Sequence, residues 1–254
     1  NAWFIKQREQ KHSDKTLQQI IHRISKLADI IYFSARKLGA ARGGGIVTSD
    51  RQLWVKMKDM VPLFEGFFTY GGMSTREIEA LAVGLREFTD ERVIQHMPSS
   101  IEHVVDHLTQ IGVPVVTPAG ALGVHLDAGA FLPQVTGAQY PAGALAIALF
   151  IVAGVRGMER GTISTDRDPI THQEVLADLE LVRLAVPRRM FSLAHLQFLL
   201  DRIQWLFEHR DLIGGLRFVE EPPVLRFFDG RLAPIGDWPT RLVKQFKADF
   251  GESL

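Results

Sequence analysis

Apolar side chains in the first part of the chain recur at helical spacing in two places. Between positions 17 and 27 they stand three or four residues apart, which predicts a helix. Ser13 and Asp14 precede this helix and can cap its first free amides. A second helix is predicted over residues 78–85, where Ser74 and Glu77 form the pattern of a capping box.

The segment between these helices is extended and rich in glycine. Residues 30–33 and 46–47 have the apolar character of short strands, and the small-residue stretch 34–45 separates them. A further helix is predicted behind Ser49 or Asp50. Helix, strand, loop and strand in this order are typical of an α/β fold.

The polar residues and Pro98 within positions 87–100 interrupt the helical pattern, so this stretch is the best candidate for a domain boundary. Beyond it the pattern predicts a helix that ends at Gly112 and another that begins at Ser192. Short strands are predicted at 113–116, 124–126, near Val155, at 181–186 and at 216–219. Together these elements predict a second domain of the α+β or α/β class.

Residues 141–155 are apolar throughout and are followed by Arg156. This run is shorter than the roughly 20 residues that a membrane-spanning helix requires. We therefore predict a buried helix that runs into a strand, and no contact with a membrane.

Composition narrows the function classes. The chain has 254 residues, with 29 basic and 29 acidic side chains and no cysteine. A net charge of zero disfavours nucleic acid and anionic lipid as partners. The lack of cysteine excludes disulfides, cysteine nucleophiles and thiolate metal sites, and it fits a reducing compartment, so we expect a cytoplasmic protein.

Three features in the chain can carry chemistry, and each has a plain structural alternative. His103 and His107 have a spacing that can bind a metal, but they project from the polar side of their helix, so no metal site is predicted. Glycines 43–45 can cradle a phosphate or mark a turn. Lys37, next to Arg36, can be an activated amine or a solvated loop lysine.

Arginines near the end of predicted strands are the other candidates. Arg183 lies in an apolar alternation, where its guanidinium needs an anion from a protein carboxylate or from a substrate. Arg188 and Arg189 can be solvated, whereas Phe227 and Phe228 can belong to the core or to a pocket wall.

Nine segments, taken in order, resemble one family of enzymes. They are NAWFIKQRE (1–9), SARK (34–37), EGFFTYGG (65–72), EALAVGLR (79–86), GVPVV (112–116), LDA (126–128), GVRGMERG (154–161), VRLAVPRR (182–189) and LRFF (225–228). Together they resemble the tryptophanase and tyrosine phenol-lyase family of pyridoxal-phosphate-dependent β-eliminating lyases, up to about position 234. The last twenty residues or so look like an extension.

The resemblance implies roles for individual residues. Lys37 resembles the lysine that holds pyridoxal phosphate as a Schiff base and shuttles the Cα proton. Ser34 matches a serine that donates to the cofactor phosphate, and Arg36 keeps the charge of a family lysine. Arg183 matches the arginine that binds the substrate α-carboxylate, a task suited to a bidentate guanidinium.

Two positions separate the subfamilies. Tyrosine phenol-lyases resemble this chain in having arginine at Arg160 and phenylalanine at Phe227, whereas tryptophanases have an aliphatic residue and a histidine there. An arginine can stabilise the phenolate that develops on the leaving group, a charge that an indole does not develop. Met158, Phe228 and Tyr70 are expected to contact the substrate.

The chain also departs from the family. Leu38 and Leu122 replace a family aspartate and histidine, and His125 replaces a phenylalanine. The aspartate that pairs with the pyridine nitrogen, the main phosphate-binding turn and the glutamate that binds potassium lie ahead of Asn1 in the family. The chain is therefore expected to be a carboxy-terminal half that needs an amino-terminal half.

The resemblance implies a fold of the aspartate-aminotransferase-like type (fold type I). Residues 1–90 would form part of the large, cofactor-binding domain and residues 91–254 an α+β small domain. The expected reaction converts L-tyrosine to phenol, pyruvate and ammonia in a homo-oligomer, a tetramer, with a potassium ion as a second cofactor. A tryptophanase-like or other amino-acid β-lyase, and a non-catalytic remnant that serves assembly, are the alternatives.

Overall fold

The computed structural model describes residues 2–36, 42–187 and 190–251. These residues form two compact units, one comprising residues 1–99 and 187–190 and the other residues 100–186 and 191–254. Both units mix helices with short antiparallel strands, which confirms the α/β character expected from the sequence. The domain boundary at residues 90–91 and the names large and small domain stay predictions.

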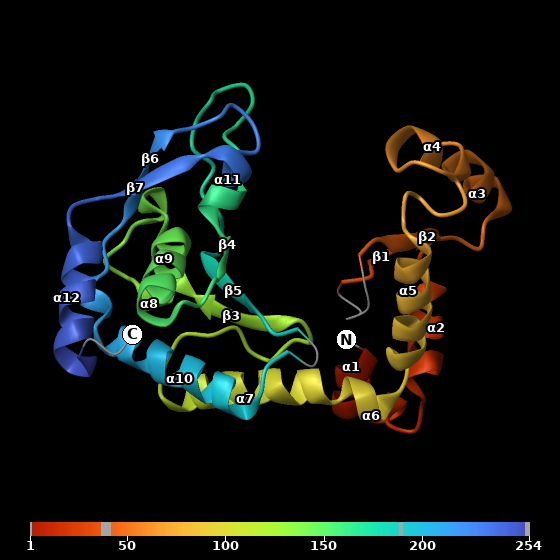
Figure 1. Cartoon of the computed structure of the whole chain (residues 1–254), viewed down its shortest axis with the longest axis horizontal. Helices are drawn as coiled ribbons and strands as arrows, with labels where there is room; N and C mark the ends of the chain where they lie inside the picture. Colours follow the sequence, from red (N-terminus) through yellow and green to blue (C-terminus); the bar gives the residue numbers. More distant parts are fainter. Residues whose placement is uncertain (1, 37–41, 188–189, 252–254) are drawn as a thin grey trace. The chain divides into compact units, whose positions relative to one another are not determined.

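The first unit is helical apart from one hairpin (Figure 1). Its elements are α1 (Ala2–Arg8), η1 (Gln10–His12), α2 (Leu17–Ser25), β1 (Ile31–Ser34), β2 (Gly44–Val47), α3 (Arg51–Lys58), α4 (Val61–Phe64), α5 (Thr75–Glu87) and α6 (Glu91–Ile94). A small core joins α1, α2 and α6 through Ala2, Leu17, Ile20 and Ile94. Helix α7 (His96–Gln110) begins in this unit and continues in the second.

Local capping explains where the helices of the first unit begin. Ser74 and Glu77 form the capping box expected for α5, and Asp50 caps α3. The caps predicted for α2 are wrong, because Thr16 caps this helix in a capping box with Gln19. Thr16 stands directly before Leu17, whereas Ser13 closes the preceding turn by donating to the carbonyl of Gln10.

The second unit is built around the apolar helix α9 (Pro141–Ala153), which packs against a three-stranded sheet in the order β3–β5–β4 (Figure 1). Its strands are β3 (Gly123–Asp127), β4 (Met158–Arg160) and β5 (Leu181–Ala185), and a separate hairpin consists of β6 (Leu216–Glu220) and β7 (Arg231–Pro234). The helices are α8 (Ala128–Phe131), η2 (Gly137–Gln139), α9, η3 (Thr162–Ser164), α10 (Leu193–Glu208), η4 (Arg210–Leu212), α11 (Arg226–Asp229) and α12 (Trp238–Phe250).

Helix α9 is apolar along its length and contacts α8, α10, α12 and the sheet, although Phe150 is 60% exposed. Leu145 and Leu149 are fully buried, as expected for a core helix. Among the described residues, no helix combines the length and the apolar character that crossing a membrane requires.

The predicted positions of two strands, near Val155 and at 113–116, are wrong. Helix α9 ends at Ala153, and Gly154 after it adopts a left-handed conformation with φ of 62°, so the chain turns near Val155 instead of extending. Strand β4 begins at Met158, where pairing with Arg183 starts. Residues 113–116 form no strand, and only Val115 makes an isolated bridge with Leu126.

Candidate active site

One face of the three-stranded sheet carries the candidate residues of the second unit. Arg183 at the centre of β5 lies opposite Met158 of β4 on one side and His125 of β3 on the other. Arg160 lies two pairs further along β4, opposite Leu181, and on the same face, because alternate residues of a strand point to the same side. Side chains of the opposite face, such as Val182 and Leu184, are buried against the core.

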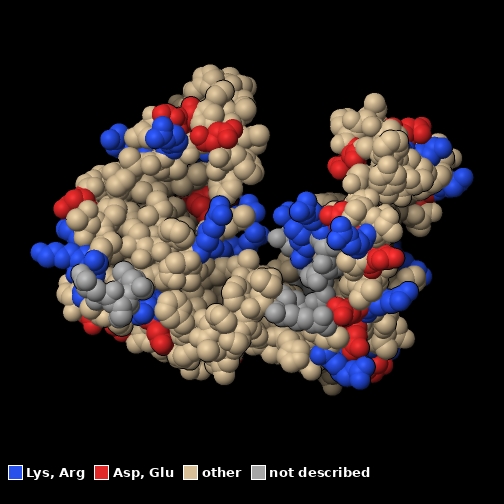
Figure 2. Space-filling view, in the orientation of Figure 1, with Lys and Arg blue, Asp and Glu red and all other residues tan. Residues whose placement is uncertain are grey.

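Arg183 has no anionic partner in the described part of the chain. Its Nη2 donates to the sulfur of Met158 at 3.1 Å, whereas its buried Nε has no hydrogen-bond partner among the described residues. No described carboxylate lies within ion-pair distance of Arg183 or of the exposed Arg160. Figure 2 shows basic side chains gathered over β4 and β5 on this side of the second unit. Two unpaired guanidinium groups on one face can bind an anion.

A pair of buried carboxylates holds the backbone after Arg160 in place. Glu180 accepts hydrogen bonds from the amides of Ala142 (3.2 Å) and Thr162 (2.8 Å), at the starts of α9 and η3. Glu159 accepts from the amide of Ile163 at 3.1 Å, and burial raises its pKa above the ordinary value. A Cβ at Gly161 would collide with the carboxylate of Glu180, so a larger residue there would displace this carboxylate from its hydrogen bonds.

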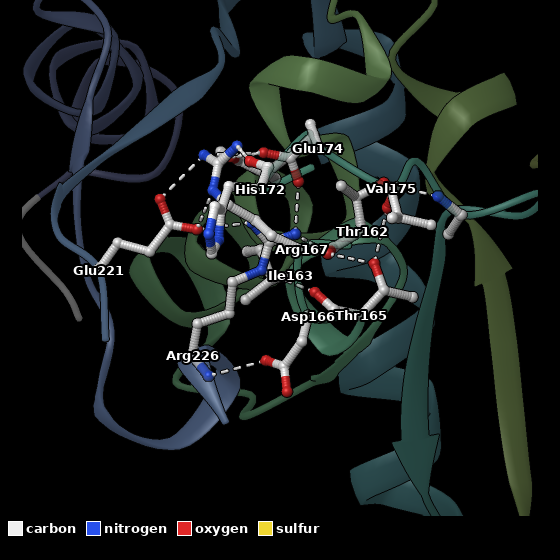
Figure 3. A network of polar contacts seen from close by, with 12 residues as sticks. Thr162, Ile163, Thr165, Asp166, Arg167, His172, Glu174, Val175, Glu221 and Arg226 are labelled. Carbon is white, nitrogen blue, oxygen red and sulfur yellow. Dashed lines mark hydrogen bonds and ion pairs between the residues drawn. The ribbon is translucent and has the colours of Figure 1, made fainter. Parts of the chain in front are cut away.

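Arg226 lies at the centre of a second polar cluster, which holds helix α11 in place (Figure 3). Its side chain is 1% exposed, and its guanidinium donates to the carbonyls of Thr162 and Thr165 at 2.7 Å each. It also pairs with Glu174 and, at 2.8 Å, with Glu221. Burial opposes the charge of Arg226, but these carboxylates outweigh it and raise its pKa.

The same cluster includes Arg167 and Tyr140. Arg167 donates to both carboxylate oxygens of Glu221, at 2.8 and 2.9 Å, and lies 3.2 Å from Glu174. Burial and a hydrogen bond to Glu174 raise the pKa of Tyr140 to about 12. Sequence reasoning missed this cluster, because its members are distant along the chain and no local pattern joins them.

Helix α11 carries the two phenylalanines expected in the leaving-group pocket. Phe227 is half-buried and Phe228 is 73% exposed, with their rings edge-to-face at 5.2 Å. Asp166 accepts hydrogen bonds from the amides of Leu225 and Arg226, at 3.0 and 3.2 Å, which holds the start of the helix. The pair is therefore a positioned aromatic surface and is not part of the core.

The remaining candidates belong to the first unit. Ser34 ends strand β1, opposite Gly44 of β2, and its hydroxyl has no hydrogen-bond partner among the described residues. Arg36 is exposed, and Tyr70 stacks on Phe67 with ring centroids 5.2 Å apart. Lys37, Leu38, Arg188 and Arg189 lie outside the described residues.

The glycine run 43–45 and the histidine pair on α7 were the other two candidates from the sequence. Gly44 and Gly45 belong to β2, and Gly43 has a positive φ of 79°, so the glycine run forms one arm of a hairpin. His103 is exposed on α7, and no cluster of three or more potential metal ligands occurs in the part of the chain that the structure describes.

Comparison with known proteins identifies the class. The model of the family described as "Beta-eliminating lyase" matches residues 1–201, and the chain belongs to this family. This membership confirms the resemblance stated above, and it implies a lyase with pyridoxal phosphate as cofactor.

Individual relatives carry more specific names. The tyrosine phenol-lyase of Pasteurella multocida is 42% identical over 235 residues, which cover 92% of this chain and 51% of the relative. The enzyme of the same name from Symbiobacterium thermophilum is 40% identical over 237 residues, covering 92% and 52%. A tryptophanase of Salinibacter ruber is 38% identical over 235 residues, covering 92% and 50%. The chain thus spans about half the length of the curated relatives it matches.

Proposed function

We propose that this chain is the carboxy-terminal half of a tyrosine-phenol-lyase-like enzyme, which converts L-tyrosine and water to phenol, pyruvate and ammonia together with an amino-terminal half. The observation that carries this proposal is the unpaired state of Arg160 and Arg183 on one face of the sheet. The half-buried guanidinium of Arg183 is costly to leave without an anion, which favours a ligand that supplies one, and the exposed Arg160 adds a second positive charge on the same face.

The first unit has groups that suit a phosphorylated cofactor. The hydroxyl of Ser34, without a partner among the described residues, and the guanidinium of Arg36 would hold the phosphate, and the amine of Lys37 would hold the cofactor covalently. Pyridoxal phosphate, when bound, supplies an electron sink for the charge that develops at Cα. Lys37 Nζ then takes the Cα proton.

Arg183 orients the substrate. A bidentate pair between its guanidinium and the α-carboxylate satisfies the Nε that has no partner among the described residues. Met158, which accepts from Nη2, limits the rotation of this guanidinium. Fixing the carboxylate in this way sets which Cα bond is broken.

Arg160 and the aromatic side chains serve the leaving group. Arg160 stabilises the negative charge on the departing phenol oxygen, an interaction that strengthens as the bond to Cβ breaks. Phe227 and Phe228 supply apolar surface for the ring, and the contact of Tyr70 with the substrate rests on the family resemblance alone. Residues 1–90 and 91–254 correspond in this proposal to parts of the large and small domains of a fold type I enzyme.

The partner of the first unit is the amino-terminal half. Large apolar side chains of α4 and the turn after it are exposed, among them Leu63 (75%), Phe64 (73%) and Phe67 (67%). Exposed apolar surface on this scale supports an interface with another polypeptide segment. A homotetramer, a potassium ion and a cytoplasmic location belong to the same proposal and rest on the family resemblance.

Borohydride reduction followed by peptide mass analysis tests the cofactor site. The chain is combined with the amino-terminal half of a relative and with pyridoxal phosphate, and the reduced cofactor is expected on Lys37. Lys37→Ala should abolish the label, whereas Lys26→Ala, a change at an exposed lysine of the same unit, should not. A label that is unchanged in Lys37→Ala contradicts the proposal.

The relative named tryptophanase supports a second candidate, a lyase for tryptophan or another amino acid. A non-catalytic remnant is the third, and it is favoured by the departures at Leu38 and Leu122. Pyruvate formation by the combined halves from tyrosine, tryptophan and S-alkylcysteine separates the three. Pyruvate from tyrosine alone supports the proposal, and no pyruvate from any of them supports the remnant.

A further inference from the structure

His125 lies beside Arg183 at one side of the candidate substrate site, although no role above involves it. Strand register places it directly opposite Arg183, at the centre of β3, and its half-buried side chain shares the face that carries Met158 and Arg160. Directly opposed residues of an antiparallel pair have Cβ atoms about 5 Å apart. An imidazole is therefore adjacent to the guanidinium that would bind the carboxylate.

The charges that act most strongly on the ring of His125 are cationic. Arg183 of β5 and Arg160 of β4 act on its ring, and α8 and residues 113–116, which also contact β3, contain no charged side chain. On its own strand Asp127 shares the face, but its carboxylate accepts from the amide of Ala130 at 3.0 Å, where it caps α8. Burial and the two arginines lower the pKa of His125, so its ring is neutral at neutral pH.

We propose that His125 is a positioning residue of the Arg183–Arg160 site, whose uptake of a proton adds a third positive charge when an anionic ligand binds. This inference rests on the proposed function, because it assumes that the two arginines bind a carboxylate.

Proton uptake and ligand binding are linked through charge. A bound carboxylate offsets the field of the two guanidinium groups, which favours the imidazolium and raises the pKa of His125. By linkage, the affinity for the anion increases as the pH falls through the pKa of His125. One more unit charge ~8 Å away, at an effective dielectric constant of ~40, changes the affinity about fivefold.

Binding of 3-(4-hydroxyphenyl)propionate to the 254-residue chain tests the proposal without the cofactor. This probe has the carboxylate and phenol of tyrosine but no amino group. NMR titration of the histidine rings gives the dissociation constant and the pKa of His125, whose signal is identified by its loss in His125→Gln. From about pH 8 to about pH 5 the affinity should rise about fivefold in the wild type and less than about twofold in His125→Gln.

Three variants separate the possible outcomes. His125→Phe, which places an apolar residue on the strand, should behave like His125→Gln, whereas His103→Gln on the exposed side of α7 should keep the wild-type pH dependence. Probe binding that depends on Arg183 but has the same pH profile with and without His125 overturns this inference alone. Binding that is unchanged in Arg183→Gln overturns the arginine site, and with it the proposed substrate recognition.

Discussion

Two pairs of arginines in the second unit differ in what surrounds them. Arg226 and Arg167 share Glu174 and Glu221, so their charges are matched within the protein (Figure 3). Arg183 and Arg160 have no carboxylate within ion-pair distance among the described residues. An arginine whose charge is matched by a carboxylate of the protein holds local structure in place, whereas an arginine without such a carboxylate is available to an anionic ligand. The sequence around each pair does not reveal this difference.

The largest expected effect concerns the matched pair. Arg226→Gln should lower the free energy of unfolding of the second unit by about 3–5 kcal/mol, because two carboxylates lose their buried partner. Urea unfolding followed by near-UV circular dichroism measures this change. Arg241→Gln, which breaks an exposed pair with Asp237, is the control and should cost less than about 1 kcal/mol. Equal losses of unfolding free energy in Arg226→Gln and Arg241→Gln would contradict the larger structural role assigned to the buried arginine.

The next largest effect is on catalysis and concerns Arg160, which has no carboxylate partner among the described residues and is proposed to stabilise the leaving phenolate. Arg160→Val in the combined enzyme should lower kcat/KM for tyrosine about 100-fold, because the developing phenolate loses its cation. Turnover of tryptophan, which releases indole, should change by less than about threefold. Arg156→Val, at an exposed position on the preceding turn, is the matched control. If Arg160→Val changes the rates for tyrosine and tryptophan by the same factor relative to the wild type, the role of Arg160 with phenolate is refuted.

A smaller effect depends on pH. Hydrogen bonds from Arg167 and Arg226 lower the pKa of Glu221 below its ordinary value of 4.5. The stability that Glu221 contributes is therefore present above about pH 4.5 and is lost as the pH falls through the lowered pKa. Glu221→Gln should cost about 1 kcal/mol at neutral pH and nothing in strong acid.

The matched control for this pH effect is Glu220→Gln, which removes an exposed pair with Arg231. Its cost at neutral pH should be smaller than that of Glu221→Gln. Unfolding free energies of both variants, measured across the acid range, test the predicted direction of the pH dependence. If the cost of Glu221→Gln grows as the pH falls, this direction is contradicted.

Elements whose ends depend on local hydrogen bonds could be predicted from the sequence. Ser74, Asp50 and Ser192 precede helices as expected, because a cap and its helix are neighbours in the chain. Strand positions were less accurate: β4 begins at Met158 and not near Val155, since its pairing with β5 depends on residues more than twenty positions away.

In the candidate site too, features that depend on neighbouring residues could be predicted from the sequence, whereas features that depend on distant residues could not. Motifs made Arg160, Arg183 and Phe227 candidates, because each lies in a short segment that resembles the family. The Arg226 cluster was missed, since it joins η3, the loop after it and α11 across about sixty positions. The surroundings of His125 became visible only with the register of β3 and β5.

The most direct test measures the stability and the ligand binding of Arg183→Gln together. If Arg183 is a ligand-binding arginine, the free energy of unfolding should change by less than about 1 kcal/mol, while affinity for 3-(4-hydroxyphenyl)propionate should fall about 10- to 100-fold. Arg217→Gln, at an exposed position of β6, should change neither quantity. A loss of about 3 kcal/mol in stability with unchanged affinity would show instead that Arg183 is a structural arginine like Arg226.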